Sequence, residues 1–234
     1  MKRFYKQVEV AGGRVLLDGK ALKTPKGAEV ALPTTALAEA VAQEWRGLGK
    51  EIVPASMPLT LLANTAIDGI AARRSEVAAE IAAFAGHDHL CYRAGEPPEL
   101  ARREAQAWDP VLVWAASLHG ARLATTTGIA SIDQPPESLA ALGRAVAALD
   151  PFVLAGLHVA TTVTGSLVLA LALAGGRLTA AEAFRLSRID EDYQAERWGL
   201  DFEAEARAKR LALELDAAAR FMDLARSDQA AAHP

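Results

Sequence analysis

The feature that most constrains this chain is a long run without any charged residue. No Asp, Glu, Lys or Arg occurs from Pro151 to Gly176, a stretch of 26 residues. A run of that length could span a bilayer if it formed one helix. Its middle, however, is the polar segment Thr161–Ser166, which would lie at mid-membrane, where polar groups cost the most free energy. We therefore expect one buried central helix, with a membrane span as the alternative.

Composition agrees with a folded chain and indicates no ligand. Hydrophobic residues make up 51% of the 234 residues and charged residues 23%, which excludes a disordered chain. The net charge of -4 argues against nucleic acid as a partner, because phosphates are bound by a basic face. The single cysteine, Cys91, excludes an internal disulfide and any metal site that needs several cysteines. No cofactor is expected.

Residues 1–56 are expected to form a small antiparallel β domain with one covering helix. Apolar residues that alternate at a period of two indicate short strands. These residues are Val8, Val10, Val15, Leu17, Val30 and Leu32. Asp18-Gly19 is a strong hairpin signal between two of the strands. From Thr34 or Thr35, as N-cap, apolar residues recur every three or four positions, which predicts the helix.

Residues 57–226 are expected to form a larger all-helical domain, and residues 227–234 a frayed tail. The predicted fold class is therefore α+β. The predicted helices cover residues 59–72, 75–84, 99–119, 137–149, 151–174, 179–198 and 201–225. Ser75 is a candidate N-cap for the second of them. Thr179 and Glu182 form a capping box, in which the hydroxyl and the carboxylate satisfy free backbone N–H groups.

A histidine-rich segment raises the alternatives of a metal site or a hydrolase-like enzyme. His87, His89 and Cys91 are ligand types for zinc, but no further cysteine or clustered histidine completes a tetrahedral shell. An enzyme would need His87, Asp88 and Glu191 to converge in one pocket. We favour a helix end that runs into a loop with a buried cysteine, and we expect neither a metal site nor catalytic residues.

The most informative segment is the acidic one that ends at Trp198. On one continuous helix, Phe184, Glu191 and Trp198 fall seven residues apart and share a stripe. A half-buried Glu191 would need a partner, for which Arg188 is a candidate. Two interpretations stay open, an ion pair that locks two helices and a contact point for another protein. Paired acid–base catalysis by Asp190 and Glu191 is weaker, because adjacent helical side chains diverge by about 100°.

Ordered motifs along nearly the whole chain resemble those of one family. In chain order they are Arg3-Phe4-Tyr5-Lys6, Leu17-Asp18-Gly19-Lys20, Leu22-Lys23-Thr24-Pro25, Leu32-Pro33-Thr34, Glu44-Trp45, Met57-Pro58-Leu59-Thr60, Asn64-Thr65-Ala66-Ile67-Asp68, Cys91-Tyr92-Arg93-Ala94, Trp108-Asp109-Pro110, Gly165-Ser166-Leu167, Glu191-Asp192-Tyr193-Gln194 and Trp198-Gly199. No single motif is diagnostic, but the ordered set is specific. It resembles the assembly chaperones that handle the α subunit of the F-type ATP synthase catalytic head.

The resemblance implies a binding protein rather than an enzyme. Members of this family bind the unassembled α subunit and prevent its aggregation until the β subunit replaces it. Carried to this chain, the resemblance implies partner contact through Glu191, Gln194, Trp198 and Asp190, with Asp190 or Glu191 at the family's acidic functional position. An enzyme and a membrane-associated assembly factor remain the alternatives.

The resemblance also carries expectations about where the protein works. The N-terminal segment lacks both an apolar core and the Ser- and Arg-rich composition of a mitochondrial transit peptide. The chain therefore looks like a bacterial, cytoplasmic member of a family that also occurs in mitochondria. We expect it to be a monomer when free and not to insert stably into a membrane.

Overall fold

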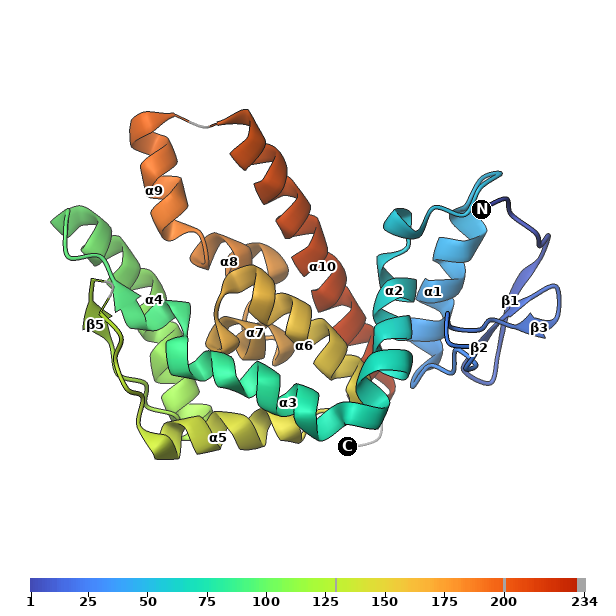
Figure 1. The fold of residues 1–234 in the computed structure, drawn as a ribbon, viewed down its shortest axis with the longest axis horizontal. Coiled ribbons are helices and arrows are strands. Elements are labelled where there is room, and N and C mark those ends of the chain that lie inside the picture. Colours follow the sequence, from blue (N-terminus) through green and yellow to red (C-terminus); the bar gives the residue numbers. More distant parts are fainter. Residues whose placement is uncertain (129, 200, 231–234) are drawn as a thin grey trace. The chain divides into compact units, whose positions relative to one another are not determined.

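The computed structural model describes residues 1–128, 130–199 and 201–230 (Figure 1). A small antiparallel sheet near the N-terminus is followed by a region that is almost entirely helical, so the predicted α+β class is confirmed. The chain forms two compact units. One contains residues 1–74, 150–156 and the chain from Ala217, and the other contains residues 75–149 and 157–216.

The domain boundary expected after residue 56 stays a prediction, because compactness does not establish which segments fold independently. Two helices, α6 (Pro151–Thr164) and α10 (Phe202–Ala230), contribute residues to both units. Helix α10 continues four residues into the expected tail, through Ala230, and the last part of that tail, 231–234, lies outside the described residues.

Three short strands form the sheet of the first unit. Strands β1 (Val8–Ala11), β2 (Arg14–Leu17) and β3 (Lys20–Ala21) pair antiparallel in the order β1-β2-β3. Asp18 and Gly19 both have positive φ in the turn between β2 and β3, which is the geometry that the hairpin signal predicts.

The strand expected at Val30 and Leu32 is reduced to isolated bridges. Within the described residues, residues 29–31 pair with the sheet only at single positions. The backbone N–H of Leu32 donates to the carbonyl oxygen of Gly13 at 2.9 Å. A Cβ on Gly13 would lie 2.9 Å from the carbonyl oxygen of Leu32, so this close approach needs glycine. The segment therefore lies beside the β1–β2 turn without forming a continuous ladder.

Helix α1 (Thr35–Gly47) covers the sheet as predicted, because it packs against β1 and β2. The hydroxyl of Thr34 accepts a hydrogen bond from the backbone N–H of Leu37 at 3.0 Å, so Thr34 rather than Thr35 is the N-cap. Trp45 is buried on the inner face of α1, and its carbonyl oxygen accepts a 2.6 Å bond from the Tyr5 hydroxyl. This bond attaches the N-terminal segment to the helix.

The uncharged run forms two helices, so the prediction of one helix over residues 151–174 is wrong. Helix α6 ends at Thr164, and α7 (Leu167–Ala174) follows after two residues. Gly165 has φ +66, and the Ser166 hydroxyl caps α7 by accepting from the N–H of Leu169 at 3.0 Å. The polar residues at the centre of the run therefore lie where the chain breaks between α6 and α7.

Burial of the run agrees with the expected core role. Every residue of α7 is buried. No helix in the described part of the chain is both long and apolar enough to cross a bilayer.

The other helical predictions hold in type but shift at their ends. The remaining α-helices are α2 (Pro58–Asn64), α3 (Arg74–Ala83), α4 (Pro98–His119), α5 (Pro136–Ala147), α8 (Ala180–Leu186) and α9 (Ile189–Trp198). Short 3-10 helices are η1 (Pro54–Ser56), η3 (Ala71–Arg73), η4 (Phe84–His87) and η5 (His89–Cys91), and η2 (Thr65–Ile70) is a π-helix. The two-residue strands β4 (Tyr92–Arg93) and β5 (Thr126–Thr127) pair with each other. Ser75 is not an N-cap, because the helical turns of η2 and η3 continue directly into α3. The helix expected over 179–198 is two helices, with a turn at Ser187-Arg188.

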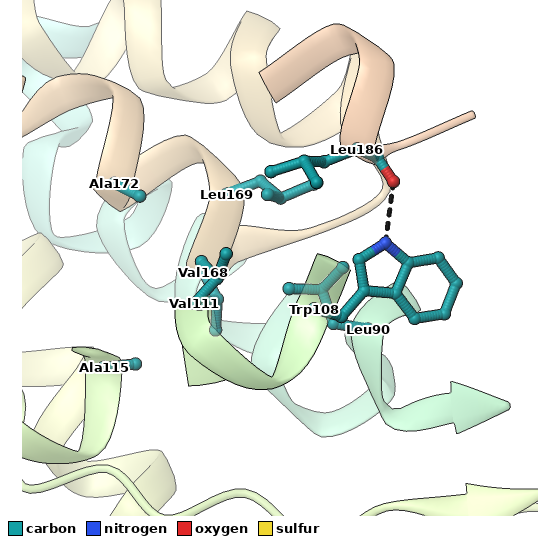
Figure 2. Packing of buried hydrophobic residues seen from close by; sticks show 8 residues of the cluster. All are labelled: Leu90, Trp108, Val111, Ala115, Val168, Leu169, Ala172 and Leu186. Atoms are coloured by element: carbon teal, nitrogen blue, oxygen red, sulfur yellow. Dashed lines mark hydrogen bonds between the residues drawn. The ribbon is translucent and has the colours of Figure 1, made fainter. Parts of the chain in front are cut away.

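The core of the second unit is built where α4 packs on α7. Trp108 is fully buried, and its indole N–H donates to the carbonyl oxygen of Leu186 at 2.8 Å (Figure 2). The cluster around it consists of Leu90, Val111, Ala115, Val168, Leu169, Ala172 and Leu186. This core fixes α4, which in turn contacts α9, the helix that carries the acidic segment.

Candidate functional site

The four candidate binding residues all lie on α9. Glu191, Gln194 and Trp198 are exposed, and Asp190 is partly buried. Glu191 is exposed rather than half-buried, because α9 begins at Ile189 as a separate helix, so the condition under which it would need a partner does not arise. Its expected partner, Arg188, lies 3.5 Å from the Asp192 carboxylate instead.

A groove between α8–α9 and the first part of α10 brings these residues together. Its volume is about 610 Å³. Its walls are lined by Val163, Phe184, Ser187, Arg188, Asp190, Glu191, Gln194, Ala195, Trp198, Gly199, Asp201, Ala204, Arg207 and Leu211. The continuous stripe of Phe184, Glu191 and Trp198 does not exist, since α8 ends at Leu186, but the groove unites the three side chains.

The groove combines apolar surface with an excess of acid. Its lining contains three carboxylates against the two arginines, Arg188 and Arg207. Trp198 exposes 82% of its surface, and so does Phe202, at the start of α10. Large aromatic side chains that stay this exposed contribute little to the core, and such residues are typical anchors of protein interfaces.

The face of α9 opposite the groove is attached to α4. Tyr193 is buried, with the guanidinium groups of Arg103 and Arg197 at 5.2 and 4.5 Å from its ring centre. Arg103 also pairs with Glu196 at 2.8 Å and with Glu99 at 2.9 Å. Helix α9 therefore has one face held by ion pairs and one face that is free to meet a partner.

Sequence reasoning missed one residue beside the groove, Glu104 of α4. It is fully buried, and its carboxylate accepts a 2.8 Å bond from the backbone N–H of Ala94. Burial and the neighbouring carboxylate of Asp190 together raise the pKa of Glu104 to about 7. The signal was present in the sequence, since Glu104 lies four residues from Leu100 and from Trp108 on an apolar helical face.

The histidine-rich segment is structural. Asp88 is fully buried, and its carboxylate accepts from the N–H of Leu90 at 3.1 Å and from that of Val168 at 3.0 Å. It thus caps the start of α7, which explains an acid in the core even though burial raises its pKa. Neither His87 nor Asp88 lines the groove that contains Glu191, so the three do not converge there as a hydrolase would need.

The alternative of a metal site at the histidine-rich segment finds no support in the described residues either. Over the described ranges, no group of three or more His, Cys, Asp or Glu residues is placed to hold a metal ion. Cys91 is buried as expected, and burial raises the pKa of its thiol to about 12. A thiol that stays protonated near neutral pH is not a nucleophile.

Comparison with known proteins places this arrangement in a family. The ATP12 chaperone protein family matches residues 2–116. The crystal structure of Atp12 from Paracoccus denitrificans is 44% identical, with a TM-score of 0.92, over 96% of this chain and 98% of that one. A lysine-for-aspartate variant of the same Paracoccus protein matches with the same values.

A curated relative extends the likeness to a eukaryote. The mitochondrial protein atp12 of Schizosaccharomyces pombe is 26% identical over 214 residues, which cover 85% of this chain and 74% of that protein. Both relatives carry the name Atp12, which is also the name of the chaperone family, and the match to the Paracoccus protein runs along almost the full length of both chains. The resemblance noted from the motifs is therefore confirmed, and this chain belongs to the ATP12 chaperone family.

Proposed function

We propose that this protein binds the unassembled α subunit of the F-type ATP synthase catalytic head and prevents its aggregation until the β subunit replaces it. Membership of the ATP12 chaperone family supports a role in ATP synthase assembly without catalysis. The groove on α9 is the proposed contact surface, with Glu191, Gln194, Trp198 and Asp190 as its binding residues.

The single observation that carries this proposal is the groove's chemistry. An indole that is 82% exposed borders a hollow that also holds Glu191 and Gln194. Aromatic anchors next to a few oriented polar groups are the pattern that dominates binding free energy in protein interfaces. An orphan subunit exposes a large apolar surface that would otherwise aggregate, and such a groove can cover part of it.

A holdase also has to release its client. The open groove suits this need, because a contact of moderate area with an acidic anchor can be tuned through its dissociation rate. Displacement by the β subunit then requires no energy source in the chaperone, only a tighter competing interface on the client. A release of this kind needs no cofactor, in line with the expectation from the sequence.

The test is a charge reversal at Glu191. We expect Glu191→Lys to leave the melting temperature unchanged within about 2 °C, since exposed substitutions change stability little. Capture of the purified α subunit should weaken about tenfold or more, because a lysine replaces the acidic anchor. Pull-down of tagged α subunit and light scattering of its aggregation measure the two consequences.

The matched control is Glu137→Lys, which reverses an exposed acid in the first turn of α5, away from the groove. This variant should capture the α subunit like the unchanged protein. If Glu191→Lys captures and protects the α subunit at the unchanged level, α9 is not the contact surface. If the unchanged protein enriches no α subunit from cells arrested in assembly, the proposed client is wrong.

We further propose that the free protein is a monomer in the bacterial cytoplasm. Size-exclusion chromatography with light scattering tests the first statement. Cell fractionation tests the second, since a membrane-associated assembly factor would sediment with the membranes in the absence of its client.

A further inference from the structure

A buried carboxyl group and a partly buried one meet where α4 contacts α9. Glu104 exposes none of its surface, and its Oε2 accepts from the Ala94 N–H at 2.8 Å. Its other oxygen, Oε1, is shielded from solvent and has no hydrogen-bond donor among the described residues. The same holds for Oδ1 of Asp190, the acid at the edge of the groove.

Two such orphaned oxygens on neighbouring acids have a simple physical explanation. An ionised carboxylate can only accept hydrogen bonds, whereas a protonated one also donates. A buried acceptor without a donor loses its hydration without compensation, and two facing carboxylates add like-charge repulsion. One shared proton removes both penalties, because it turns the two orphaned oxygens into the two ends of one hydrogen bond.

We propose that Glu104 holds this proton and donates it in a hydrogen bond to Asp190, so that Glu104 is a positioning residue for the binding groove. Asp190 is in the first turn of α9 and directly precedes Glu191. The bond therefore sets the start of the helix that carries the proposed contact residues. The inference rests on the proposed function for its effect on binding, but not for the protonation itself.

The surroundings of Glu104 favour this assignment. Burial raises its pKa most, the neighbouring Asp190 carboxylate adds to the effect, and the result is about 7. On α9, Asp190 is the charged group that faces it, and α7 contributes none because that helix has no charged residue.

Two influences oppose this assignment, because the hydrogen bond from the Ala94 N–H and the positive charge of Arg93 of β4 both lower the pKa of Glu104. Nε and Nη1 of Arg93 are buried and have no hydrogen-bond acceptor among the described residues. Arg93 Nη2 donates to the Asp109 carboxylate at 2.8 Å, and the group lies 5.0 Å from the centre of the Trp108 ring. Arg93 therefore weakens the case for a proton on Glu104 without replacing that proton by an ion pair.

The consequence is a groove whose shape depends on pH. Below about pH 7 the shared proton holds α9 against α4. Above it, Glu104 ionises beside Asp190, and the two charges repel across the helix contact. A binding-competent state that requires the proton would be about tenfold less populated at pH 8 than at pH 6, and apparent affinity would fall by the same factor.

Glu104→Gln is the variant that isolates this effect. The glutamine amide keeps an oxygen for the Ala94 N–H and supplies an N–H to Asp190 at every pH. We expect its capture of the α subunit to match that of the unchanged protein at about pH 6 and to stay level up to about pH 8. Glu104→Leu fills the same space without a donor and should bind weakly throughout. Any titration of the client itself appears equally in the unchanged protein and in Glu104→Gln, so it cancels.

Protonation is measured without any partner by the carboxyl carbon shift of glutamate-labelled protein, with Glu104→Gln to assign the signal. A midpoint near 7 supports the shared proton, whereas a midpoint in the ordinary glutamate range overturns it. A midpoint near 7 together with capture that does not change with pH overturns the positioning role. Loss of all capture by the unchanged protein at about pH 6 would reject the proposed function while leaving the protonation result intact.

Discussion

Helices α7 and α9 belong to the same unit and have similar lengths, yet they differ in almost every other respect. All eight residues of α7 are buried, and none is charged. Helix α9 has ten residues, of which only Tyr193 is fully buried. The position of α7 is determined by packing on both sides, so its residues contribute to stability. Helix α9 has one face that is not packed against the core, so the residues on that face are available for binding.

The largest expected effect is on the packing side of this comparison. Trp108→Ala removes the largest side chain between α4 and α7 and leaves the Leu186 carbonyl without its 2.8 Å donor. We expect a loss of about 3–5 kcal/mol in the free energy of unfolding. Urea denaturation followed by circular dichroism measures it. A loss below about 1 kcal/mol would show that the cluster in Figure 2 does not determine stability.

A smaller effect is expected at the cap of α7. Asp88→Ala leaves the backbone N–H groups of Leu90 and Val168 buried without an acceptor, which costs about 1–3 kcal/mol. The exposed Asp133→Ala is the matched control and should change stability by less than about 0.5 kcal/mol. Thermal unfolding of the two variants side by side decides whether this acid is structural. Equal stabilities would restore a functional role for Asp88.

The smallest effect on stability is expected at the opposite extreme, on α9. Trp198→Ala should change the free energy of unfolding by less than about 0.5 kcal/mol, because the indole is 82% exposed. The binding free energy for the α subunit should instead weaken by about 2 kcal/mol, which is a roughly thirtyfold higher Kd, as for an interface anchor. Surface plasmon resonance with immobilised α subunit measures this. Unchanged affinity would break the proposed division between a packing helix and a binding helix.

The parts of the fold that were predictable from sequence are those with a strong local signal. The Asp18-Gly19 turn, the Thr34 cap and the capping box of α8 all lie where local chemistry placed them. The helical type of nearly every segment after residue 57 followed from apolar periodicity.

The errors arose where tertiary contacts outweigh a continuous pattern. Helical periodicity runs through Ser166 and through Ser187 without interruption, yet both helices break there. At Ser166 the break is fixed by Asp88, which is 80 residues away along the chain and caps α7. The role of Glu104 was not predicted because the residue beside it in the fold, Asp190, is equally far away along the chain. Residue pairs of this kind are visible only once the chain is folded.

The break at Gly165 also limits the length of the helices that the uncharged run forms. The hydrocarbon core of a bilayer is about 30 Å thick, and a helix rises about 1.5 Å per residue. A straight helix over the 26 uncharged residues would measure about 39 Å, whereas α6 and α7 measure about 21 Å and about 12 Å. A glycine and a serine thus divide the uncharged run into two helices that are each shorter than the hydrocarbon core is thick.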